Sequence, residues 1–177
     1  QNGVPVRSTV PAPDGRFVLY PVPAGNYDLV VSAEGRVTAV MTGVPISDSS
    51  RTFATPAGTR IDPPAGTPRL ATGVVSTSGS TTVPLASVRA TQAVSTTRVE
   101  RTSRSADADT GEYSLPLVAG SPVFTAYNPA ATALNFTADD GQAGRFRLEA
   151  STEGKAPVTA DINVTDADVD TPLVFAP

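Results

Sequence analysis

Three aspartates near the end of the chain alternate along the sequence and offer oxygen ligands for a metal ion. They are Asp166, Asp168 and Asp170. Calcium takes about six to eight hard oxygen ligands, and loop carboxylates can supply them. The spacing does not follow the EF-hand loop, which carries a distal glutamate, and aspartate is also the ordinary residue of Asx turns. We favour the turn interpretation, which requires no cofactor, and keep a calcium site as the alternative.

Tyrosines are the second group with binding chemistry, because an aromatic face can stack on a sugar ring. Tyr20 and Tyr127 lie outside the cleanest alternating stretches and are the candidate ligand-binding residues. Phe17, Tyr27 and Tyr113 alternate with leucine and valine, so we expect their side chains to point inward. The chain has no tryptophan, which weakens the sugar hypothesis. A core position, or a hydroxyl bonded to a loop, is the alternative for the tyrosines.

Residue types needed for catalysis are scarce. The chain has no histidine and no cysteine, so it lacks imidazole bases, thiols, disulfides and the usual zinc and haem ligands. A hydrolase would have to use the single lysine, Lys155, or a pair of carboxylates. Neither a Gly-x-Ser-x-Gly nor a Ser-x-x-Lys motif occurs. We therefore predict that the protein is not an enzyme.

Charge and hydropathy limit the partners. The net charge is −4 and the basic residues are dispersed, so we do not expect nucleic acid as a partner. No apolar run approaches the ~18 residues of a membrane-spanning helix, and we expect a chain that does not span the membrane. Gln1 follows no initiator methionine, which leads us to expect an upstream domain of the same polypeptide.

These side chains must be positioned by β-strands, because valine, threonine, serine, proline and glycine dominate and no window has a helical period. Residues 14–36 read as one unit: an Asp-Gly turn, a strand over 17–20, a proline-glycine turn and a strand over 27–31. A degenerate copy occupies residues 109–120. The predicted fold is all-β, with two tandem antiparallel β-sandwich domains.

The division of the chain follows from a proline-rich stretch. Residues 1–55 form the first predicted domain, which is truncated at its N-terminus or has its lost strands replaced by contacts elsewhere. Residues 56–68 are a semi-rigid linker rich in proline and glycine. Residues 69–177 form the second predicted domain, enlarged by an inserted hairpin near 128–144. We also expect a strand over residues 4–10 that pairs with 17–20.

The repeated unit resembles a known family. Residues 14–35 follow the pattern Asp-Gly-x-Phe-x-Leu and then Pro-Ala-Gly-x-Tyr-x-Leu-x-Val-x-Ala-x-Gly, and the second copy matches at 73–75, 111–115 and 118–120. This pattern is similar to carboxypeptidase regulatory-like domains, which are transthyretin-like (prealbumin or immunoglobulin-like) β-sandwiches. The resemblance implies a non-catalytic accessory module, and the wider superfamily includes carbohydrate-binding domains. The order of features resembles the C-terminal part of bacterial exported lipoproteins, which also carry a domain of unknown function.

The predicted function is therefore a structural or interaction module of an exported bacterial cell-envelope protein. The resemblance implies a location that is periplasmic, anchored to the outer membrane or extracellular. The expected partner is a protein or a surface glycan. A carbohydrate-binding module is the alternative function, and fold alone does not decide between the two.

Overall fold

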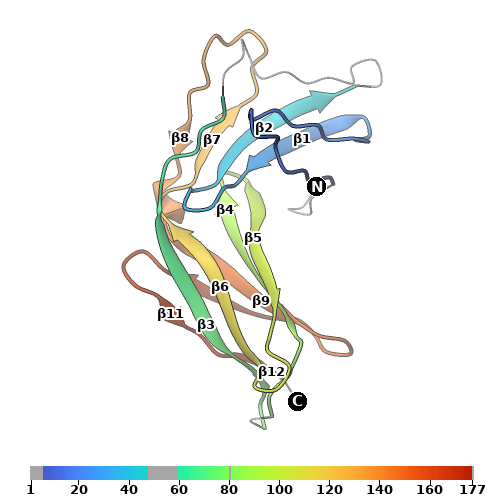
Figure 1. Cartoon of the computed structure of the whole chain (residues 1–177), viewed down its shortest axis with the longest axis vertical. Helices are drawn as coiled ribbons and strands as arrows, with labels where there is room; N and C mark the ends of the chain where they lie inside the picture. The colour runs from blue at the N-terminus through green and yellow to red at the C-terminus, as the bar shows by residue number, and fades with distance from the viewer. Residues whose placement is uncertain (1–5, 48–59, 80, 177) are drawn as a thin grey trace.

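The computed structural model describes residues 6–47, 60–79 and 81–176, and it is all-β in several sheets (Figure 1). No α-helix occurs within these ranges. The strands are β1 (Gly25–Val31), β2 (Ala39–Ile46), β3 (Thr67–Thr77), β4 (Ser87–Val94), β5 (Thr97–Ser105), β6 (Glu112–Ala119), β7 (Val123–Ala126), β8 (Thr137–Ala138), β9 (Arg145–Ser151), β10 (Val158–Asn163), β11 (Val169–Asp170) and β12 (Leu173–Phe175). A short 3-10 helix, η2 (Asp140–Gln142), precedes β9.

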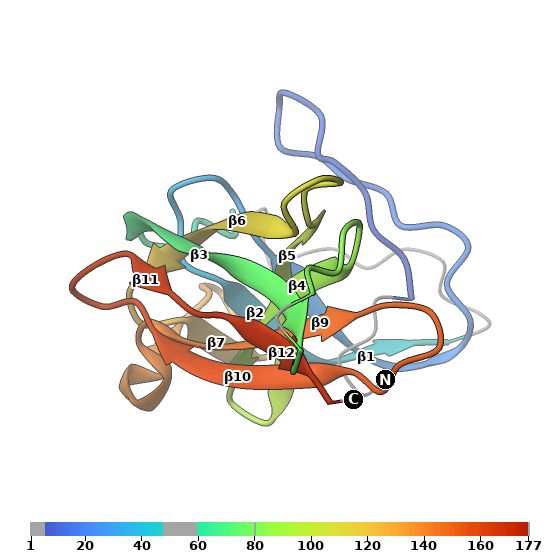
Figure 2. The ribbon, with the colours of Figure 1, turned by 90° about the horizontal axis from the view of Figure 1, so that it is seen from below.

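Two sheets pack face to face in the lower part of Figure 1 and share the main core. One has the strand order β10-β9-β4-β5, and in the other β3 pairs with β6, β11 and β12. Figure 2 shows β3 and β6 on one side and β9 and β10 on the other. Buried and exposed residues alternate along β6 and β9, because successive side chains of a strand point to opposite faces. Leu115, Leu148 and Phe175 are among the largest buried side chains of this core.

A further sheet lies above this pair and draws its strands from distant parts of the sequence. Its order is β1-β2-β7-β8. β7 and β8 follow β6 in the chain, yet β7 pairs in parallel with β2, with Ala39 opposite Val123. The sequence predicted that residues 123–127 would continue the second unit, whereas here they extend the sheet of the first. Of the predicted hairpin near 128–144, the structure shows β8 and η2.

Three pairings differ from the purely antiparallel sheets expected from the sequence. β2 with β7, β3 with β11 and β3 with β12 are parallel. The cause is topological, because β7, β11 and β12 return to their partners through connections that do not reverse the direction of the strand. Short β11 and β12 share one edge of β3, where they follow each other along the strand.

The segment before β1 contains turns but no strand, so the predicted strand over 17–20 is wrong, as is the described part of the one over 4–10. Prolines at 11, 13, 21 and 23 remove backbone donors from this stretch. Phe17 and Leu19 are half-buried rather than core residues. The Asp14-Gly15 turn is confirmed: Gly15 has φ 84°, and its amide donates to the Ala12 carbonyl at 2.8 Å. Figure 2 shows this segment, in blue, projecting from the rest.

A closely packed joint connects the upper sheet to the lower pair. The β4–β5 hairpin rises into it, where Val94 and Val99 form a buried cluster with Val40. Part of the predicted linker also packs here, since the Gly66 amide donates to the Gly35 carbonyl at 2.9 Å. The predicted linker residues 56–59 lie outside the described residues, and β3 already begins at Thr67.

Candidate functional site

The two candidate sugar-binding tyrosines have different surroundings. Tyr20 lies in the segment before β1 and its side chain is 74% exposed. Tyr127 follows β7 and is half-buried, and its amide donates to the Thr42 carbonyl at 2.8 Å. Of the two, Tyr20 therefore offers the more accessible ring.

The tyrosines predicted to face inward bond to loops. Tyr113 is buried in the main core, and its hydroxyl donates to the Thr171 carbonyl at 2.5 Å. Burial, together with the nearby charge of Asp170, raises the pKa of Tyr113 to about 12. Tyr27 is half-buried, and its hydroxyl donates to the Pro23 carbonyl at 2.9 Å. These contacts match the structural interpretation of these two side chains.

The three candidate calcium ligands lie in and before β11, close to the start of β3. Asp168 accepts a hydrogen bond from the Leu70 amide at 2.9 Å, and Asp166 accepts one from the hydroxyl of Thr165 at 3.4 Å. Asp170 belongs to β11. Within the described residues, no three acidic side chains come together in a group that could hold a metal ion. The calcium hypothesis therefore stays a prediction that needs a solution test.

Asp107 shows the turn chemistry expected of aspartates in this sequence. Its carboxylate accepts hydrogen bonds from the amides of Asp109 and Thr110, both at 2.9 Å. These bonds, with that of the Thr110 hydroxyl, lower the pKa of Asp107, because they stabilise the charged form. Asp107 thus shapes the turn before β6.

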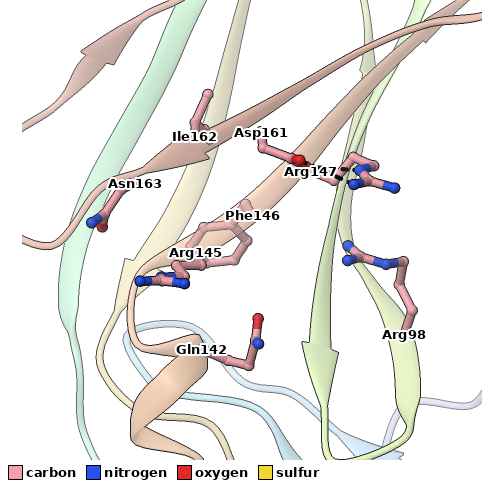
Figure 3. A pocket seen from close by; sticks show the side chains of 8 residues that line it. All are labelled: Arg98, Gln142, Arg145, Phe146, Arg147, Asp161, Ile162 and Asn163. Carbon is pink, nitrogen blue, oxygen red and sulfur yellow. Dashed lines mark hydrogen bonds and ion pairs between the residues drawn. The ribbon is translucent and has the colours of Figure 1, made fainter.

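A shallow groove of about 440 Å³ lies on the outer face of the β10-β9-β4-β5 sheet (Figure 3). Arg145 and Arg147 are exposed residues of β9, and Arg98 enters from β5. Asp161 and Asn163 contribute from β10. The other lining residues are Gln142, Phe146 and Ile162. The groove therefore combines guanidinium, carboxylate and carboxamide groups over a paired region of the sheet.

Hydrogen bonds hold two of the three arginines of the groove. The guanidinium of Arg147 makes a two-point contact with Asp161, with nitrogen–oxygen distances of 2.7 and 3.0 Å. This contact lowers the pKa of Asp161, with a further contribution from the charge of Arg98. One nitrogen of Arg98 donates to the Thr91 hydroxyl at 3.0 Å. The Arg145 side chain makes no hydrogen bond or ion pair with the described residues.

Two carboxylates accept hydrogen bonds from the tip of the β4–β5 hairpin at the joint. Asp28 of β1 accepts the Gly43 amide at 3.1 Å with one oxygen and the Thr97 hydroxyl with the other. Asp139, which precedes η2, accepts the Ser95 amide at 3.0 Å. The hairpin of the lower sheets is thereby tied both to the upper sheet and to the segment between β8 and β9.

Buried polar side chains complete the joint. Gln92 is 2% exposed and Thr38 is 0% exposed. The Thr38 hydroxyl bonds to the Gln92 carboxamide at 3.4 Å, and the Gln92 amide donates to the Gln142 carbonyl at 3.1 Å. Arg101 donates to the Arg36 carbonyl at 3.2 Å, and burial lowers its pKa to about 10. Because such groups are costly to bury unpaired, these bonds favour one arrangement of the two parts.

Sequence reasoning missed the groove and the joint. Apolar and polar residues alternate over 145–150, and residues 97–105 are polar along one face. This pattern agrees with the exposure of Arg145 and Arg147, whereas Arg98 and Arg101 are half-buried. The pairing of β4 with both β5 and β9 brings these faces together. Nothing in the local pattern specifies that pairing.

No family model, no curated protein and no solved structure matches this chain. The resemblance to carboxypeptidase regulatory-like domains therefore rests on the residues of the repeated unit. In the part of the chain that the structure describes, no helix has the length and hydrophobicity needed to cross a membrane.

Proposed function

We propose that the protein is a non-catalytic structural or interaction module of an exported bacterial cell-envelope protein. Its two repeated units are similar to carboxypeptidase regulatory-like domains. The second unit forms most of the β-sandwich, and its strands β7 and β8 extend the single sheet of the first. The observation that carries this proposal is the joint between the two parts. β7 and β8 extend the upper sheet, and the tip of the β4–β5 hairpin packs against that sheet through Val94 and Val99.

A joint of this kind suits a spacer that holds its neighbours at a fixed distance. Modules linked only by flexible segments move relative to one another by default, unless the interface between them is large and apolar. Here the packing of the buried valines, the Thr38–Gln92 hydrogen bond and the hydrogen bonds at the hairpin tip must all be lost before the two parts can rotate. Among the described residues, β1 pairs only with β2, so its other edge offers the upper sheet a surface for a protein partner.

The test measures rigidity across the joint. Because the chain has no cysteine, Asn26→Cys on β1 and Thr159→Cys on β10 place one spin label on each part, at exposed positions. For a rigid spacer, we expect pulsed electron–electron double resonance to give a single narrow distribution of the distance between the two spin labels. A broad distribution, in a variant whose thermal unfolding matches that of the native chain, would contradict the proposal.

The alternative function, carbohydrate binding, is favoured by the exposure of Tyr20. A glycan array followed by titration of any hit tests it directly. Saturable binding that is lost in Tyr20→Ala but retained in Tyr27→Phe supports a sugar-stacking role. Tyr127→Ala serves as a second probe, with its unfolding midpoint checked first because this side chain is half-buried. Absence of any glycan binding leaves the spacer function as the better explanation.

A further inference from the structure

The groove of Figure 3 is basic although the protein is acidic. Three arginines and one aspartate line it, whereas the whole chain has a net charge of −4. Asp161 neutralises Arg147 through their two-point contact. Neither Arg98 nor Arg145 makes an ion pair with the described residues, although Arg98 is near enough to Asp161 to help lower the pKa of that carboxyl.

The guanidinium groups of Arg98 and Arg145 keep free donors. Arg98 uses one terminal nitrogen on Thr91, which leaves its other nitrogens available. Arg145 uses none on the described residues. A guanidinium is a planar fork that matches the two oxygens of a carboxylate. In Figure 3 the Arg98 and Arg145 side chains lie at opposite sides of the groove, with Gln142 between them, so two separate anionic groups can be held.

We propose that this groove binds a carboxylate-bearing polysaccharide. Arg98 and Arg145 hold carboxylates of two sugar units, while Gln142, Asn163 and Asp161 exchange hydrogen bonds with hydroxyl groups. The Asn163 oxygen already accepts from the amide and hydroxyl of Thr165, which orients its amide nitrogen as a donor. Tyr20 does not line the groove, and this binding role goes beyond the structural function proposed above.

The position of the groove selects a saccharide over other acidic polymers. An extended peptide gains affinity by adding backbone hydrogen bonds at a sheet edge, but this groove lies over β9, which is paired with both β4 and β10. Only side chains are offered there. A nucleic acid would find no exposed aromatic side chain in the groove on which a base can stack.

The probe is a short oligogalacturonate, titrated into the full chain by calorimetry, with its fully methyl-esterified form as the matched neutral ligand. We expect saturable binding of the acid form that weakens with added salt, and none of the ester. Arg98→Gln and Arg145→Gln should each lower the affinity about tenfold, the loss of one charged hydrogen-bonded contact. Arg104→Gln, an exposed β5 residue outside the groove, should leave the affinity unchanged.

Several results would overturn this proposal. Equal binding of the ester, or an equal loss of affinity in Arg104→Gln, would show that the groove does not recognise carboxylates. Binding of poly-glutamate with the same affinity and the same dependence on Arg145 would assign the groove to acidic peptides instead. The unfolding midpoint of each variant is measured first, and Arg145→Lys, which keeps the charge but not the fork, should bind more weakly than the native chain.

Discussion

Adding one methyl group at Gly66 should loosen the joint. A Cβ built at this position lies 2.4 Å from the Ala119 carbonyl oxygen and 2.4 Å from a methyl carbon of Val118. The first of these is a backbone atom, so it cannot move aside as a side chain can. Gly66 is also fixed on its other side, because its amide donates to Gly35. Gly66→Ala therefore forces the connector away from the end of β6.

The size of the effect follows from the cost of overpacking, which is typically about 1–3 kcal/mol. For a chain of this length, each kcal/mol lowers the unfolding midpoint by about 2–4 °C. We therefore expect a drop of about 2–12 °C for Gly66→Ala. The same substitution should broaden the distance distribution between labels on β1 and β10, since the joint and not one sheet alone is strained.

Gly79→Ala is the matched control. Its Cβ meets only a threonine hydroxyl at 3.9 Å, and its backbone is not in the left-handed region. Here alanine should be neutral, or stabilise by up to about 1 kcal/mol by restricting the unfolded chain. Calorimetry compares the unfolding midpoints of the two variants, and pulsed electron–electron double resonance compares their label-to-label distance distributions. Identical midpoints and identical distance distributions for Gly66→Ala and Gly79→Ala would refute the argument that the joint is closely packed.

Three further outcomes follow from the titrating groups and carboxylates. The pKa of Tyr113 is raised in the folded state to about 12, so the folded chain loses stability as pH rises above about 10. In denaturant titrations, Tyr113→Phe should reduce this loss of unfolding free energy at alkaline pH. The pKa of Asp107 is lowered, so its contribution to stability is present above about pH 4 and is lost as pH falls through the folded-state pKa. Asp107→Asn should therefore reduce the dependence of the unfolding midpoint on acidic pH. Because the Asp168 carboxylate already accepts a hydrogen bond from the Leu70 amide, we expect the same unfolding midpoint in millimolar calcium as in chelator. A calcium-dependent rise that is absent in Asp168→Asn would instead establish the calcium site.

Two strands of the main core have a clear period in the sequence. Alternation over 145–150 corresponds to β9, and alternation over 113–117 lies within β6. Periodicity reports which face a side chain takes, but it carries no information about which strand is the neighbour. The parallel pairing of Ala39 with Val123 links residues separated by several intervening strands. The groove and the joint both depend on such distant pairings, so they are visible only in the structure.

The two copies of the repeated unit show how a partner strand decides the outcome of a local pattern. Residues 17–20 and 112–119 carry similar alternation, yet only the second forms a strand. β6 tolerates Pro116 because the backbone amide of the opposite residue, Leu70, donates its hydrogen bond to Asp168 and not to β6. The missing donor of Pro116 then faces the open edge of the sheet, where proline is accepted. The first copy has prolines at 21 and 23 and no strand beside it among the described residues that could pair in this way, so its alternation leaves Phe17 and Leu19 half-buried instead of building a core.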